Sequence, residues 1–326
     1  MKTPLIAAGF ALFANVASAE TLHVYAPDYF ASDWGPGPAI KQAFEAECDG
    51  CDLEWVTGDV LPRLMLEGER TDADVVIGLG QDETARARAT GLFAPHGVDV
   101  TGLTMPVDWA DDTFLPFDWS HVAFIYNSDK MATAPASFED LLAMDEDIRI
   151  VIQDPRSSPA GLALVMWVKA VYGDEAEAFW AKLAPRILTV TKGWSEAYGL
   201  FTEGEADMVL SFTTSPAYHI IAEEDATKAA AIFGEGHYLY VELAGKIAGS
   251  DQPELADQFM QFVLSEPFQQ IIPEGNWSFP AKLAAEKLPE GFGGLALPEK
   301  VFFFPEAEAE AMKDEAIAEW QRGLSQ

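Results

Sequence analysis

Short apolar segments alternate with helical patterns along the first part of the chain. The pattern predicts strands at 21–26, 53–56 and 74–78, with helices at 39–47 and 61–65 between them. Strands that alternate with helices usually pair in parallel, because each connection crosses over one face of the sheet. The sequence therefore predicts an α/β fold whose largely parallel sheets are flanked by helices.

The length of the chain predicts more than one core. A single hydrophobic core usually stops growing at about 250–300 residues. This chain has 326 residues, of which 49% are hydrophobic. Two lobes are therefore the expected arrangement.

Residues 1–19 have the pattern of a cleaved export signal. Lys2 precedes an apolar run at 5–16, and small residues at 17–19 form a cleavage pattern. A membrane anchor is the alternative, but a bilayer span needs about 20 apolar residues. We therefore expect a mature chain that begins at Glu20 and is soluble in the periplasm.

The charge of the chain limits its partners. The formal net charge is −33, from 53 acidic and 20 basic residues. Such a charge repels nucleic acid, which we exclude as a partner, and attracts cationic ligands. Most of these acids are expected simply to form a solvated surface.

The only two cysteines, Cys48 and Cys51, lie in a CDGC motif. In an oxidising compartment they are expected to form a short-loop disulfide. A redox role is the alternative, but nothing around the motif resembles a thioredoxin. The five histidines show no spacing typical of zinc ligands. We therefore expect no metal and no cofactor.

Four predicted strand-to-helix junctions carry polar residues. They lie at 28–34, 57–59, 154–161 and 211–218. In an α/β sheet, ligands bind where strands end and helices begin, so these junctions could face one cleft.

Two of these junctions predict helix starts that favour anions. Ser157 or Ser158 is expected to cap a helix that begins at Pro159, and Ser215 to cap a helix that begins at Pro216. Free N–H groups at such a start can hold a phosphate. A plain capping role is the alternative for each serine.

Five aromatic side chains are predicted in or beside these loops. Each could pack in a core or contact a ligand. A cationic ring between such faces gains about 0.5–2 kcal/mol per contact. The carboxylates of Asp28, Asp59 and Glu196 could neutralise a ring of this kind. The aromatic residues are Trp34, Trp194, Tyr198, Tyr218 and Trp277.

Motifs spread over nearly the whole predicted mature chain carry a family resemblance. They include DWGPGPAIKQAFE at 33–45, QDPRSSPAGLAL at 153–164, TVTKGWSEAYGLF at 189–201, TTSPAYH at 213–219 and GNW at 275–277. These motifs resemble those of thiamine-binding periplasmic proteins, the solute receptors of thiamine ABC transporters. The resemblance implies a two-lobe periplasmic-binding-protein fold of type II-like architecture with a hinged cleft.

The resemblance also implies where the lobes join. The segment at 114–126 resembles the crossover strand by which such receptors leave their first lobe, and 236–244 is expected to cross back. We assign residues 20–122 and 237–326 to lobe 1 and residues 123–236 to lobe 2. Two connections make a hinge, so the cleft is expected to close around its ligand.

The resemblance further implies a ligand, a partner and a set of contacts. The ligand is thiamine or its mono- and pyrophosphate, and the partner is the membrane permease of an ABC importer. Phe212 and Pro27 stand where the family pattern carries tyrosines. The predicted ligand-binding residues are Asp28, Trp34, Gly58, Asp59, Ser158, Pro159, Trp194, Phe212, Thr213, Thr214, Ser215, Tyr218 and Trp277.

Two other function classes stay open. A thiamine-degrading enzyme of this fold needs a free cysteine nucleophile, whereas both cysteines here are expected to be paired. A ferric-ion or polyamine receptor would share the architecture, but an iron site needs a tyrosine or carboxylate cluster, which Phe212 weakens. The chain has no GxSxG, HExxH or P-loop motif. We therefore expect a monomeric binding protein rather than an enzyme.

Overall fold

The computed structural model describes residues 20–48 and 50–325, so the export signal predicted at 1–19 lies outside the described residues. Its strands are β1 (Glu20–Ala26), β2 (Cys51–Thr57), β3 (Val75–Gly80), β4 (Phe93–Ala94), β5 (Phe114–Asn127), β6 (Ile150–Gln153), β7 (Ile187–Thr191), β8 (Met208–Phe212), β9 (Lys228–Ala231), β10 (His237–Ile247), β11 (Phe279–Pro280) and β12 (Val301–Phe302). Its α-helices are α1 (Gly37–Glu47), α2 (Val60–Glu67), α3 (Thr84–Ala89), α4 (Phe138–Ala143), α5 (Pro159–Tyr172), α6 (Ala176–Leu183), α7 (Trp194–Thr202), α8 (Ser215–Ala222), α9 (Pro253–Val263), α10 (Glu266–Gly275), α11 (Glu290–Gly293) and α12 (Glu306–Leu324).

The strands form one sheet whose main path has the order β2-β1-β3-β10-β5-β8-β6-β7. Pairing is parallel at both ends, where β1 lies beside β2 and β3, and β6 lies beside β7 and β8. Pairing is antiparallel in the centre, where β10 meets β3 and β5, and β5 meets β8. The predicted parallel sheets therefore occupy the two ends, and the crossover strands supply the antiparallel centre.

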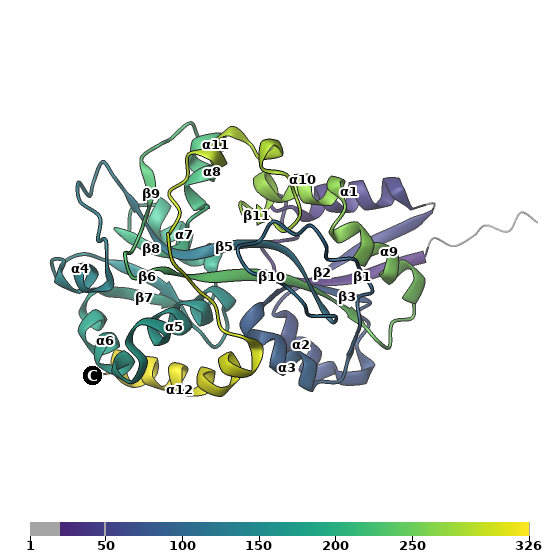
Figure 1. The fold of residues 1–326 in the computed structure, drawn as a ribbon, viewed down its shortest axis with the longest axis horizontal. Helices are drawn as coiled ribbons and strands as arrows, with labels where there is room; N and C mark the ends of the chain where they lie inside the picture. Colours follow the sequence, from purple (N-terminus) through teal and green to yellow (C-terminus); the bar gives the residue numbers. More distant parts are fainter. Residues whose placement is uncertain (1–19, 49, 326) are drawn as a thin grey trace, which may run out of the picture.

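Strands β5 and β10 connect the two halves of the molecule. Figure 1 shows both running through the middle, from the half that holds β6 to β9 into the half that holds β1 to β3. The first part of β5 pairs with β10, and its last part pairs with β8 and β9. Both strands match the crossovers expected at 114–126 and 236–244. The chain therefore passes between the halves where a hinge is expected.

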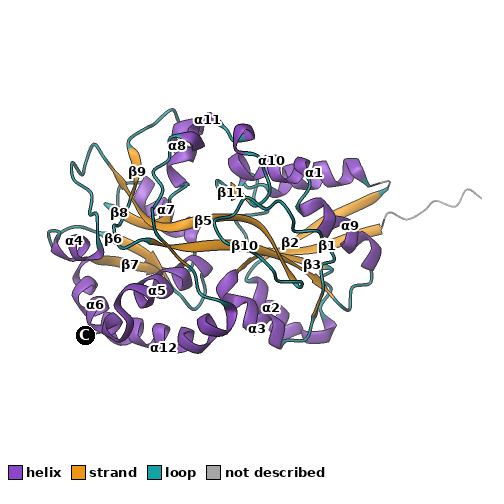
Figure 2. Cartoon of the chain, viewed as in Figure 1, coloured by secondary structure: helices purple, strands orange, loops and turns teal. Residues whose placement is uncertain are grey.

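Each half has its own apolar core, and helices cover both sides of the sheet (Figure 2). In the half with β1 to β3, the fully buried Phe44 of α1 and Phe259 of α9 pack edge to face, with ring centroids 5.1 Å apart. In the other half, Trp167 of α5 is fully buried, and its indole N–H donates to the Gly236 carbonyl at 2.9 Å. Each half therefore has buried apolar packing of its own, as expected for two lobes.

Helix α12 packs on the half that the sequence assigns to lobe 2. Its Trp320 is buried in the same core as Trp167, and Glu319 pairs with Lys169 of α5 at 2.7 Å. Gly323 lies so close to α6 that a Cβ there would meet the Cβ of Trp180 at 2.4 Å. The lobe boundaries stay predictions, but these contacts place α12 with lobe 2 rather than with lobe 1, because its apolar face completes the lobe 2 core.

The two cysteines are joined as predicted. Cys48 caps the end of α1 and Cys51 begins β2, and their sulfur atoms form a disulfide with 5.8 Å between the Cα atoms. The chain therefore has no free thiol in this structure. Among the described residues, no helix combines the length and apolar character that a membrane crossing requires.

Candidate ligand-binding cleft

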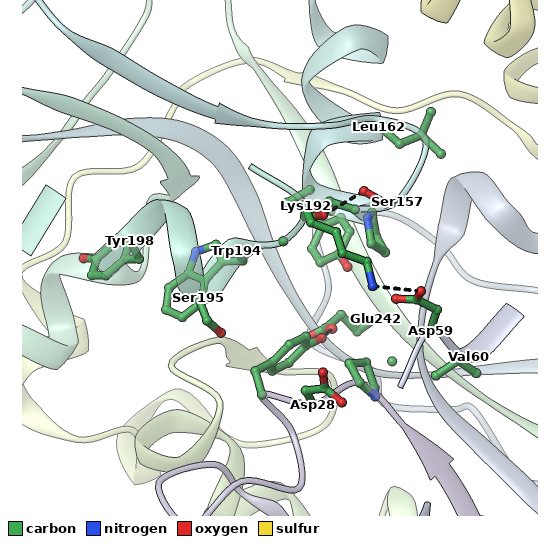
Figure 3. Close-up of a pocket in the computed structure, with 18 of the residues that line it drawn as sticks. Asp28, Asp59, Val60, Ser157, Leu162, Lys192, Trp194, Ser195, Tyr198 and Glu242 are labelled. Carbon is green, nitrogen blue, oxygen red and sulfur yellow. Dashed lines mark hydrogen bonds and ion pairs between the residues drawn. The ribbon is translucent and has the colours of Figure 1, made fainter. Parts of the chain in front are cut away.

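A cavity of about 920 Å³ lies between the two halves of the molecule. It is lined by the loops after β1 and β2 on one side, and by the starts of α5, α7 and α8 on the other. Figure 3 shows Asp59, Lys192, Trp194 and Glu242 around this space. Eleven of the thirteen predicted residues line it, namely Asp28, Trp34, Gly58, Asp59, Ser158, Pro159, Trp194, Phe212, Ser215, Tyr218 and Trp277.

The remaining two predicted residues, Thr213 and Thr214, do not line the cavity. Both are fully buried at the junction between β8 and α8. The Ser120 hydroxyl of β5 lies 3.0 Å from the Thr214 hydroxyl and 3.4 Å from that of Thr213. Their side chains therefore attach this junction to the crossover strand, and their contact with a ligand stays a prediction.

Helix α5 begins as the sequence predicts. Ser158 is its N-cap, and the serine hydroxyl accepts the Gly161 N–H at 3.4 Å. Gly161 packs so tightly on the end of β6 that a Cβ there would meet the Gln153 carbonyl oxygen at 2.5 Å. This contact fixes the direction of α5, so its free N–H groups are held at the cavity wall.

Helix α8 begins one residue earlier than predicted. Its N-cap is Thr214, and Ser215 is already helical. The Ser215 hydroxyl lies 2.7 Å from the Ser211 hydroxyl and accepts the Phe212 N–H at 3.3 Å. Ser215 therefore bonds back to the end of β8 instead of capping the helix, which corrects the predicted capping role.

The aromatic wall on the α7 side is held by a chain of contacts. Trp194 stacks on Tyr198, with centroids 4.7 Å apart, and its indole N–H donates to the Ser211 hydroxyl at 2.8 Å. The Tyr198 hydroxyl lies 2.9 Å from His219 Nε2, and Glu223 pairs with His219 Nδ1 at 2.6 Å. These contacts fix the orientation of Trp194 at the cavity wall.

Four further predicted aromatic residues line the cavity from other directions. Tyr218 meets Trp277 edge to face at 5.2 Å, and Phe212 stacks on Tyr240 at 5.0 Å. Trp277 has φ of 54°, a left-handed conformation that non-glycine residues seldom adopt. Trp34 is 57% exposed. These rings give the cavity faces from both halves of the molecule, and Trp34 leaves a large apolar surface free at its rim.

One ion pair connects the two sides of the cavity. Lys192 Nζ lies 3.1 Å from Asp59 Oδ2, as Figure 3 shows. Both side chains are more than half exposed, so the pair is worth at most about 1 kcal/mol. Arg156, another basic residue that lines the cavity, pairs with Asp154 beside it. Both of these basic groups are therefore already paired with carboxylates.

A cluster of buried polar groups at the cavity, which we call the acidic floor, was not predicted from the sequence. It is formed by Tyr29, Asp118, Glu242 and Asn276. Glu242 lines the cavity and is 4% exposed. Burial raises the pKa of Asp118 well above its ordinary value, and the charge of Glu242 raises it further. Burial also raises the pKa of Glu242, although hydrogen bonds from Tyr29 and Asn276 oppose the shift. Each apolar crossover segment contains a single acidic residue, and this pattern is the sequence signal that could have indicated the acidic floor.

One cluster among the described residues could in principle hold a metal. His219, Glu223 and Asp225 bring three ligand-type atoms within 4.8 Å of one another. Both His219 nitrogens are engaged, by Tyr198 and Glu223, and Asp225 pairs with Lys228 at 2.7 Å. These contacts support the aromatic wall, and they leave the three ligand-type atoms already bonded to protein groups.

The sequence pattern of a family described as bacterial extracellular solute-binding protein matches residues 32–270. The chain belongs to this family. This solute-binding protein is 48% identical to the thiamine-binding periplasmic protein of Escherichia coli (strain K12) over 316 residues, 96% of each chain. A solved structure titled periplasmic thiamin binding protein has a TM-score of 0.92 and 46% identity, covering 99% of this chain and 100% of that one. The family resemblance and the two-lobe fold predicted from the sequence are confirmed.

A more distant structure separates fold from function. An iron-bound protein from Pseudomonas aeruginosa has a TM-score of 0.74 with this solute-binding protein but only 22% identity, over 93% of this chain and 99% of that one. This similarity concerns the fold alone. The family and the relatives at high identity are binding proteins, which agrees with the expectation of a non-enzyme.

Proposed function

We propose that this protein binds thiamine in the periplasm and delivers it to the membrane permease of an ABC importer. The observation that carries the proposal is that eleven residues predicted from the family resemblance line one cavity. Its volume of about 920 Å³ falls in the range of small-molecule sites, which is about 300–1,000 Å³. The relative from Escherichia coli, named thiamine-binding periplasmic protein, is 48% identical over nearly the whole chain.

The chemistry of the cavity suits a flat cationic ligand. Trp194, Tyr218 and Trp277 present aromatic faces that attract a delocalised cation such as thiazolium. Carboxyl groups at Asp28 and Glu242 line the same space and favour a positive charge. Neither cysteine is a free thiol, so the nucleophile required by the thiamine-degrading alternative is missing.

A phosphate on the ligand is proposed to lie at the start of α5, near Ser158. A helix start contributes about 0.3–1 kcal/mol to an anion at an exposed site. The side chains of Lys192 and Arg156, which line the same cavity, are paired with carboxylates. The site therefore stabilises a phosphate only modestly, and thiamine itself is expected to bind comparably well.

Transport tests the proposal in the cell. Deletion of the gene in the source bacterium is expected to abolish high-affinity uptake of radiolabelled thiamine, and a plasmid copy is expected to restore it. Excess unlabelled thiamine should compete for uptake, and excess spermidine should not. Uptake that is unchanged by the deletion would contradict the assignment to import.

The phosphate position gives a second expected result. A Ser158→Ala variant should lose more affinity for thiamine monophosphate than for thiamine, by up to about 5-fold. Calorimetry with both ligands measures the difference. Ser195→Ala removes a hydroxyl that lines the same cavity and is the matched control. Equal losses for both ligands would mean that Ser158 does not act on the phosphate.

A further inference from the structure

The acidic floor lies where the two crossover strands meet. Asp118 on β5 and Glu242 on β10 are partners in the antiparallel register. Both are buried, at 1% and 4% exposure, and only Glu242 lines the cavity. Two buried carboxyl groups therefore lie next to each other on the crossover strands, and Glu242 is the one that faces the cavity.

The hydrogen bonds of the floor are unequal. Glu242 accepts from the Tyr29 hydroxyl at one oxygen and from the Asn276 amide at the other, the latter at 2.7 Å. Asp118 accepts from the same Asn276 amide at 2.5 Å through Oδ2, while its Oδ1 is buried without a partner. Glu242 therefore has donors for both oxygens, and Asp118 has a donor for only one.

This inequality decides which carboxyl group is charged. Two buried carboxyl groups in contact cannot both ionise at low cost, so they share one proton. The raised pKa of each group agrees with this arrangement. The proton belongs on Asp118, because a carboxylate oxygen without a donor is strongly destabilised in a buried site. Glu242 then carries the negative charge and faces the cavity.

Among the described residues, no basic side chain that lines the cavity pairs with Glu242. Four basic side chains line the cavity, and three of them are paired elsewhere: Lys192 with Asp59, Arg156 with Asp154, and Lys313 with Glu310. The guanidinium of the fourth, Arg86, contacts the Met65 sulfur. The uncompensated charge is therefore available to a ligand.

We propose that Glu242, held in place by Tyr29 and Asn276, is the anionic anchor of the cleft and accepts an N–H hydrogen bond from the aminopyrimidine ring of the ligand. The inference rests on the proposed binding of thiamine. A carboxylate directs its lone pairs at N–H donors, which the exocyclic amine of an aminopyrimidine supplies. The thiazolium ring has no N–H group, and its delocalised charge suits the aromatic faces instead.

The decisive variant is Glu242→Gln, which removes the charge and keeps the shape. Calorimetry is expected to give an affinity for thiamine about 30-fold below wild type, because a buried hydrogen bond to a charged group is lost. Glu203→Gln is the matched control, since Glu203 is an exposed acid at the end of α7 that does not line the cavity. That variant should bind thiamine within about 3-fold of wild type, because exposed charges act weakly through water.

Fragments of thiamine locate the contact. Glu242→Gln should lose affinity for 4-amino-5-hydroxymethyl-2-methylpyrimidine and keep its affinity for the N-methylated hydroxyethylthiazolium fragment. Retained thiazolium binding also demonstrates that the variant is folded. If Glu242→Gln does not fold, Tyr29→Phe removes one hydroxyl from the floor, and about a 5-fold loss for thiamine and for the pyrimidine is expected.

The outcomes separate the inference from the function on which it rests. Wild-type protein that does not bind thiamine would overturn the proposed function. Wild-type binding together with an unchanged Glu242→Gln affinity, or with equal losses in the Glu242 and Glu203 variants, would overturn the anchor alone. Loss of thiazolium binding instead of pyrimidine binding would also overturn it.

Discussion

Trp194→Ala is expected to weaken thiamine binding about 30-fold, or about 2 kcal/mol, while the protein stays folded. Trp194 lines the cavity and is held by stacking on Tyr198 and by a hydrogen bond to Ser211. The alanine variant removes both the aromatic face and its fixed orientation. Because Trp194 is only partly buried, the loss of core packing should be small.

Trp194→Phe separates the two contributions. Phenylalanine keeps an aromatic face against Tyr198 but cannot donate to Ser211, so we expect a loss of less than about 5-fold. Calorimetry with thiamine and a thermal melt for each variant provide the comparison. An alanine variant with wild-type affinity would show that Trp194 serves packing rather than the ligand.

Asp82→Asn is expected to change how stability depends on pH. Asp82 is buried, accepts from the Tyr238 hydroxyl at 2.7 Å, and has a pKa that burial raises from 3.8 to about 7. A carboxyl group whose folded-state pKa is raised binds its proton more tightly in the native state. Its contribution to stability is therefore fully present below about pH 4 and is lost as the pH rises through about 7.

The expected size of this effect is large. A shift of about three pKa units corresponds to about 4 kcal/mol between pH 4 and pH 8. Urea unfolding of wild type and Asp82→Asn at both pH values measures it as a difference, which cancels the other titrating groups. The asparagine variant should match wild type at pH 4 and exceed its stability at pH 8. Parallel pH profiles for the two proteins would refute the burial argument.

Local sequence patterns predicted the parts of the fold that depend on neighbouring residues. The apolar run at 75–77 gave β3, and Ser158 followed by Pro159 gave the start of α5. The crossover strands at 114–126 and 236–244 were recognisable from the family resemblance and match β5 and β10. Each of these features is encoded within one continuous segment.

Features that depend on pairing between distant segments could not be predicted. Asp118 and Glu242 meet only because β5 and β10 pair in one particular register, which neither segment specifies alone. Thr213 and Thr214 carry motif hydroxyls, yet their contacts with Ser120 place them behind the cavity surface. The sequence shows the apolar stripe of α12. It does not show which half of the molecule this helix packs against.

The most direct test of the proposed function is a measurement of thiamine binding by purified, ligand-stripped protein. A ligand of about 20 heavy atoms enclosed by several aromatic faces can reach nanomolar affinity, near −12 kcal/mol, within known limits of ligand efficiency. Isothermal titration calorimetry should therefore give a single thiamine site with a Kd of about 1–10 nM. An absence of heat and of tryptophan quenching at micromolar thiamine, with binding of ferric ion or spermidine instead, would contradict the account.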